Sequence, residues 1–158
     1  MKKIILSVLS ILLGAVMGSR AAAKPLNRRI SRLQTMSDKH LSLYIMMNRW
    51  VQVKQDGKCM ADYLEKHNYK SVAIYGMSYA GERLFDELKN SKILVAYGID
   101  RDADGICADM KIFTPDDQLE KVDAVIVTTI FFIDEIEKIL AGKLSCPIIS
   151  LQEILCDM

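Results

Sequence analysis

The chain has 158 residues and a mass of 17.8 kDa, a size typical of one domain with a short appendage. Hydrophobic residues make up 51% and charged residues 26%, which excludes a disordered or fibrous protein. Residues 1–54 contain ten Lys and Arg but one acid, whereas residues 55–158 contain eleven Lys and Arg and nineteen acids. This division argues against a nucleic-acid-binding domain and favours a membrane-facing N-terminal segment.

The first 23 residues have the pattern of a membrane anchor. An apolar run from Ile4 to Gly18 follows two lysines, and we expect residues 4–19 to contact lipid. Lys and Arg are more numerous after the run than before it, which predicts a single span with the C-terminal domain in the cytoplasm. A cleaved signal peptide with Ala21–Ala23 at the cleavage site, and a buried core helix, are the alternatives.

Residues 24–56 have the pattern of a basic amphipathic helix that connects the anchor to a domain. Apolar residues recur at steps of three and four, which is helical periodicity; they are Leu26, Ile30, Leu33, Leu41, Tyr44, Met47 and Val51. Arg28, Arg29 and Arg32 would meet anionic headgroups, or else they form an ordinary solvated face. Asp56-Gly57 is expected to end the helix, and Trp50 is expected to pack rather than to function.

Residues 57–158 alternate between helical and strand patterns. Strands are expected at 71–75, 92–99, 111–113, 122–129 and 147–150, and helices or helical turns at 59–68, 79–90, 115–119, 131–141 and 151–155. Such alternation predicts right-handed crossovers and parallel strands. The expected fold class is therefore α/β, with a small doubly wound, mostly parallel five-stranded Rossmann-like sheet preceded by the hydrophobic helix and the basic helix.

Candidate ligand-binding residues cluster where the expected strands end. Gly76-Met77-Ser78-Tyr79-Ala80-Gly81 follows a strand and opens a helix, the context of a dinucleotide-binding loop. Gly76 would allow the tight turn and Gly81 the close helix packing, whereas Ser78 replaces the middle glycine. Asp100 at the end of the second strand suits ribose hydroxyls, and Arg101 suits a phosphate. Thr128 and Thr129, at the end of the fourth strand, would either donate to a ligand or cap the next helix.

Three other site types receive less support from the sequence. A serine hydrolase elbow at Ser78 lacks a histidine downstream, because the two histidines are His40 and His67. Residues 100–105 match the first half of an EF-hand loop, but Lys111 stands where a bidentate Glu is required. The four cysteines are scattered, so we expect reduced thiols and no metal site.

The segments 71–81, 93–101 and 122–129 together resemble the small Rossmann-like nucleotide- or nucleotide-sugar-binding domains of bacterial surface-polysaccharide biosynthesis. The resemblance implies that Gly76, Ser78, Gly81 and Asp100 face a ligand, either NAD(P) or a nucleotide sugar. A Tyr-x-x-x-Lys catalytic pair is not found after the fourth strand, which argues against an autonomous epimerase.

The expected function is a membrane-tethered module that binds a nucleotide, dinucleotide or nucleotide sugar and assists a glycan-assembly enzyme. The alternative is a non-catalytic protein-interaction module with a degenerate crevice. A small oxidoreductase that a partner subunit completes is a third possibility. None of the three involves nucleic acid.

Overall fold

The computed structural model describes the backbone from Lys2 to Met158 and the side chains of residues 26–158. The chain divides into two compact units, Met1–Leu41 and Ser42–Met158. The predicted anchor at residues 4–19 lies outside the described side chains, so the anchor stays a prediction. Within residues 26–158, no helix is long and apolar enough to cross a lipid bilayer.

The first element is a single helix, α1, which runs from Lys2 to Gln55. It ends at Asp56-Gly57 as predicted, and Gly57 adopts a positive φ of 73° that suits glycine. Every side chain from Leu26 to Leu41 is exposed. The last turns differ, because Met46, Trp50 and Val53 are buried in the core of the second unit. The predicted packing role of Trp50 is therefore confirmed.

The second unit contains a five-stranded sheet in which every pair of neighbouring strands is parallel. Its spatial order is β3-β2-β1-β4-β5. The strands are β1 (Ser71–Tyr75), β2 (Leu94–Ile99), β3 (Ile112–Phe113), β4 (Ala124–Val127) and β5 (Ile148–Ser150). The predicted five-stranded α/β fold is thus confirmed, and the sheet is entirely parallel. β1 and β4, the two most buried strands, lie side by side at its centre.

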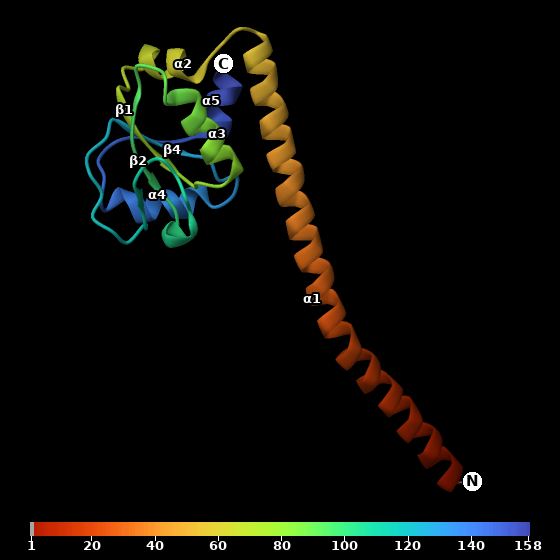
Figure 1. The fold of residues 1–158 in the computed structure, drawn as a ribbon. Helices are drawn as coiled ribbons and strands as arrows, with labels where there is room; N and C mark the ends of the chain where they lie inside the picture. Colours follow the sequence, from red (N-terminus) through yellow and green to blue (C-terminus); the bar gives the residue numbers. More distant parts are fainter. Residues whose placement is uncertain (1) are drawn as a thin grey trace. The chain divides into compact units, whose positions relative to one another are not determined.

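Helices cover both faces of the sheet (Figure 1). α2 (Met60–Lys66), α3 (Tyr79–Leu88), α5 (Leu151–Asp157) and the last turns of α1 pack on the face that carries Val72 and Ile74. α4 (Ile133–Ala141) packs on the face that carries Ala73 and Tyr75. Because successive strand residues point to opposite faces, the uninterrupted apolar run of β1 fills both layers of core.

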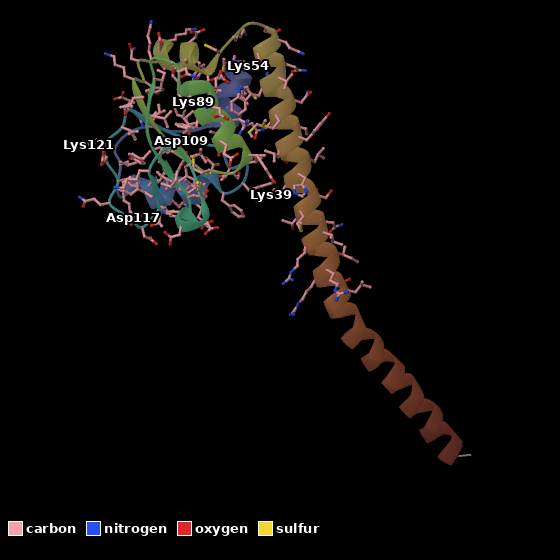
Figure 2. All side chains as sticks on the ribbon, in the orientation of Figure 1. Lys39, Lys54, Lys89, Asp109, Asp117 and Lys121 are labelled. Carbon is pink, nitrogen blue, oxygen red and sulfur yellow. The ribbon has the colours of Figure 1, made fainter. Side chains whose placement is uncertain are left out.

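Two connections are less regular than the others. The loop between β2 and β3 contains only a short 3₁₀ turn, η1 (Ala103–Gly105). The expected helical turn at 115–119 is absent from this part of the described chain, which forms a hydrogen-bonded turn instead. The carboxylate of Asp117, labelled in Figure 2, accepts a hydrogen bond from the Thr114 amide at 2.7 Å.

Candidate functional site

The candidate site lies at the carboxyl ends of β1 and β4. The chain leaves β1 toward β2 on one side and leaves β4 toward β5 on the other. The two connections therefore diverge, which opens a crevice at the edge of a doubly wound sheet. The residues singled out in the sequence follow β1, β2 and β4 at this same edge.

Gly76, in the turn after β1, and Gly81, in the first turn of α3, are both required by close packing. Gly76 has a φ of 93°, and a Cβ there would lie 2.7 Å from Thr129 Cγ2 and 2.9 Å from Thr128 Oγ1. A Cβ on Gly81 would overlap the carbonyl oxygen of Gly76. Gly76 therefore makes the turn and Gly81 lets α3 approach β1, the structural roles that their spacing predicts.

Asp100 lies next to this loop, but its carboxylate is already engaged. Its Oδ2 accepts a hydrogen bond from the Met77 amide at 2.7 Å, and its Oδ1 accepts one from the Asp102 amide at 3.1 Å. The Met77 amide is one of those that a phosphate would need. Asp100 thus holds the loop in place, and its oxygens are less available to ribose hydroxyls than the sequence suggests.

The rest of the loop divides into a buried part and an exposed part. The Met77 side chain is buried against Gly98, where a Cβ would lie 2.9 Å from Met77 Cγ. Ser78 precedes α3 as its N-cap residue and is exposed, and Tyr79 is 76% exposed. Within residues 26–158, the amides from Ser78 to Gly81 have no backbone partner. These amides at the start of α3 are available to an anion.

The two threonines after β4 have different roles. Thr128 is buried, and its hydroxyl lies within hydrogen-bonding distance of the Tyr75 and Gly76 carbonyl oxygens. It ties β4 to the turn after β1 and has no hydrogen to offer to a ligand. Thr129 is half-buried, and its buried hydroxyl has no hydrogen-bond partner among the described residues.

A cavity of about 160 Å³ joins the ends of the three strands, and we call it the switch-point pocket. Its lining residues are Tyr75, Gly76, Asp100, Arg101, Thr129, Phe131, Phe132 and Ile136. It brings together four residues that the sequence singled out: Gly76, Asp100, Arg101 and Thr129. Met77, Ser78, Tyr79, Gly81 and Thr128 do not line it.

Arg101 is exposed and forms an ion pair with Glu135 of α4, at 3.2 Å between Nη2 and Oε1. The nearby Tyr75 hydroxyl raises the pKa of Arg101, with a further contribution from Glu135. The guanidinium therefore stays charged beside the pocket. An anionic ligand could replace Glu135 as its partner.

Sequence reasoning missed the contributions of Tyr75, Phe131, Phe132 and Ile136. Tyr75 was assigned only to the apolar strand, although its position as the last residue of β1 places it at the carboxyl edge. Phe131 and Phe132 are consecutive aromatic residues in a connection where polar residues are the norm. That departure from loop composition was the available signal.

The EF-hand resemblance of residues 100–105 is not accompanied by a suitable geometry. Asp100 points its carboxylate toward the Met77 and Asp102 amides. Asp102 packs against Gly105, where a Cβ would lie 2.7 Å from its Oδ2. Across residues 26–158, no three His, Cys, Asp or Glu side chains are grouped as metal ligands.

The strand order, the parallel sheet and the helices on both faces define an α/β domain of general Rossmann-like architecture. Compared with family models, curated proteins and solved structures, the chain matches none of them.

Proposed function

We propose that the chain binds a nucleotide-type small molecule, either a nucleotide or a nucleotide sugar, at the carboxyl edge of the sheet. The observation that carries the proposal is the switch-point pocket, which joins Gly76, Asp100, Arg101 and Thr129. Ligands of open α/β sheets bind in this position. The free amides at the start of α3 and the Arg101 guanidinium provide partners for phosphate oxygens.

The loop after β1 favours a mononucleotide or nucleotide sugar over NAD(P). The Ser78 side chain stands where the pyrophosphate of a dinucleotide approaches a glycine most closely. The Met77 amide already donates a hydrogen bond to Asp100 and is not free for a phosphate. NAD and NADP are therefore expected to bind more weakly than single nucleotides.

The binding test uses the full chain in detergent and isothermal titration with ADP, UDP, UDP-glucose, NAD and NADP. At least one of the first three should bind saturably. Arg101→Gln should weaken that binding about tenfold, because a hydrogen bond to a charged group contributes roughly 1.5–3 kcal/mol. Arg83→Gln is the matched control, since Arg83 is also exposed and ion-paired but lies outside the pocket. Absence of saturable binding for all five compounds would reject the proposal.

We further propose that residues 4–19 anchor the module in the cell membrane, with the C-terminal domain in the cytoplasm and a glycan-assembly enzyme as its partner. The basic residues that follow the apolar run support this orientation. The full chain should sediment with membranes after carbonate washing, and a C-terminal tag should resist protease in intact cells. A soluble protein that begins near Lys24 would contradict the anchor.

A protein-interaction module is the second candidate function, and a groove on the helical face favours it. The groove has a volume of about 390 Å³ and lies along the last turns of α1 and α3; its lining residues are Met47, Trp50, Val51, Lys54, Gln55, Arg83 and Glu87. The bond between Asp100 and Met77 also fits a crevice that needs no ligand. If the titrations detect no nucleotide binding, the protein-interaction function is favoured.

A further inference from the structure

The switch-point pocket contains two buried hydroxyl groups that lack hydrogen-bond partners. Among the described residues, neither Tyr75 Oη nor Thr129 Oγ1 has a partner with hydrogen-bond geometry; Arg101 lies near the Tyr75 hydroxyl, which raises the pKa of Arg101, but does not satisfy it. Tyr75 is 3% exposed, and both residues line the pocket. A buried hydroxyl without a partner is destabilising, so its presence at a cavity calls for an explanation. Each hydroxyl can both donate and accept a hydrogen bond.

Two aromatic residues also line the pocket, and one of them has an unfavourable backbone conformation. Phe131 and Phe132 are 37% and 69% exposed. Phe132 has a φ of 72°, in the left-handed region that a bulky side chain rarely adopts. Both residues line the pocket, and the centroids of their rings are 6.4 Å apart. Strain of this kind is concentrated at ligand sites.

The size and charge of the pocket indicate which part of a ligand it takes. About 160 Å³ is below the roughly 300–1,000 Å³ of pockets that enclose a whole ligand, so one ring-sized group is the appropriate occupant. The Asp100 carboxylate lines the pocket and disfavours a phosphate inside it. Arg101, which is exposed and paired with Glu135, can meet a phosphate outside.

We propose that the switch-point pocket receives the base of a nucleotide, with the Tyr75 and Thr129 hydroxyls bonded to the polar edge of the base. Phe131 and Phe132 contact the apolar surface of the ring, and the phosphates lie toward Arg101 and the start of α3. The inference rests on the proposed nucleotide-binding function. It adds that recognition depends on the base, through two neutral hydroxyls and not through Asp100.

The test compares ligands with and without a base on the full chain. ADP and UDP are titrated beside ribose 5-phosphate and inorganic pyrophosphate, which supply the anion alone. At least one nucleotide should bind about tenfold or more tightly than either base-free compound. Tyr75→Phe and Thr129→Val should each weaken nucleotide binding about fivefold, the effect of one neutral hydrogen bond. Thr129→Val should not change the binding of pyrophosphate.

Tyr97→Phe is the matched control, because Tyr97 is also a buried tyrosine on the same face of the sheet. Its hydroxyl donates to the Glu120 carbonyl oxygen at 2.5 Å, and burial raises its pKa to about 12. Tyr97→Phe should lower the melting temperature of the unliganded protein and leave nucleotide affinity unchanged. Tyr75→Phe should leave that melting temperature unchanged or raise it, since it removes an unpaired hydroxyl.

The outcomes separate the inference from the function on which it rests. If pyrophosphate binds as tightly as ADP and UDP, or if Tyr75→Phe and Thr129→Val bind nucleotides like the wild type, base recognition is rejected and nucleotide binding stands. The two hydroxyls are then hydrogen-bonded to ordered water alone. If none of these four compounds binds, and UDP-glucose, NAD and NADP do not bind either, the function and the inference are both rejected.

Discussion

Asp100 shows how one contact changes the interpretation of a motif. Its place at the end of β2 could be read from the sequence, and so could the glycines of the loop after β1. The 2.7 Å bond from the Met77 amide to its carboxylate joins residues 23 positions apart, and no local pattern encodes such a contact. The same holds for Thr128, whose hydroxyl interacts with carbonyl groups of β1 and the following turn. The sequence therefore indicated which residues lie at the carboxyl edge of the sheet, but not which contacts they make or which polar groups they leave free.

Phe132 offers a test of strain at the scale of one residue. Its backbone has a positive φ and its ring is mostly exposed, so the ring contributes little burial. Left-handed geometry costs a non-glycine residue roughly 1–2 kcal/mol. Phe132→Gly should therefore be more stable than Phe132→Ala by about 1 kcal/mol in urea unfolding, although both lose the ring. Equal stabilities would show that the conformation stores no strain.

Among the elements, the strands were the easiest to predict and the connections the hardest. β1 and β4 are short apolar runs rich in β-branched residues, bounded by turn residues, and such runs predict buried parallel strands. The segment after Thr114 did not become helical, because Asp117 binds the Thr114 amide and competes with helical hydrogen bonding. Side-chain bonds to backbone amides also position the start of β1, where Asp123 accepts from the Lys70 and Ser71 amides.

The two backbone hydrogen bonds that the Asp123 carboxylate accepts should make the folding stability depend on pH. The hydrogen bonds from the Lys70 amide, and then from the Ser71 amide, lower the pKa of Asp123. Because its pKa is lower in the folded state, the ionised carboxylate stabilises the fold at pH values above the pKa of the unfolded state. This contribution is lost as the pH falls through the pKa of the folded state. Asp123→Asn should therefore be less stable than the wild type at pH 7, and the difference should shrink below roughly pH 4.

Urea unfolding between pH 7 and pH 3 measures this dependence. Asp116→Asn is the matched control, because Asp116 is exposed and accepts no hydrogen bond from the described residues. Its stability should follow that of the wild type over the whole range. A wild-type curve parallel to that of Asp123→Asn at every pH would contradict the assigned role of the carboxylate.

At the scale of the whole molecule, the end of α1 belongs to the folded unit that contains the sheet. The Glu87 carboxylate of α3 accepts hydrogen bonds from Trp50 Nε1 at 2.8 Å, from Lys54 Nζ at 2.9 Å and from the Met60 amide at 2.8 Å; Lys54 is labelled in Figure 2. Arg49 donates to the Leu155 carbonyl oxygen of α5 at 2.9 Å. These bonds fix the last turns of α1 to α3 and α5, and Glu87 also joins the start of α2 to α3. A movement of these turns would therefore be transmitted to α3, whose first turn borders the proposed ligand site.

The placement of these turns predicts which fragments fold. A fragment of residues 57–158 loses Met46, Trp50 and Val53, each almost fully buried. Burial of one such side chain contributes about 1.5–3 kcal/mol, and the sum of three approaches the total stability of a small domain, roughly 5–15 kcal/mol. Residues 42–158, the compact unit, should melt cooperatively by circular dichroism, whereas residues 57–158 should show no cooperative transition. If both fragments melt at the same temperature, the last turns of α1 are not needed for folding and their contacts with Glu87 do not stabilise the fold.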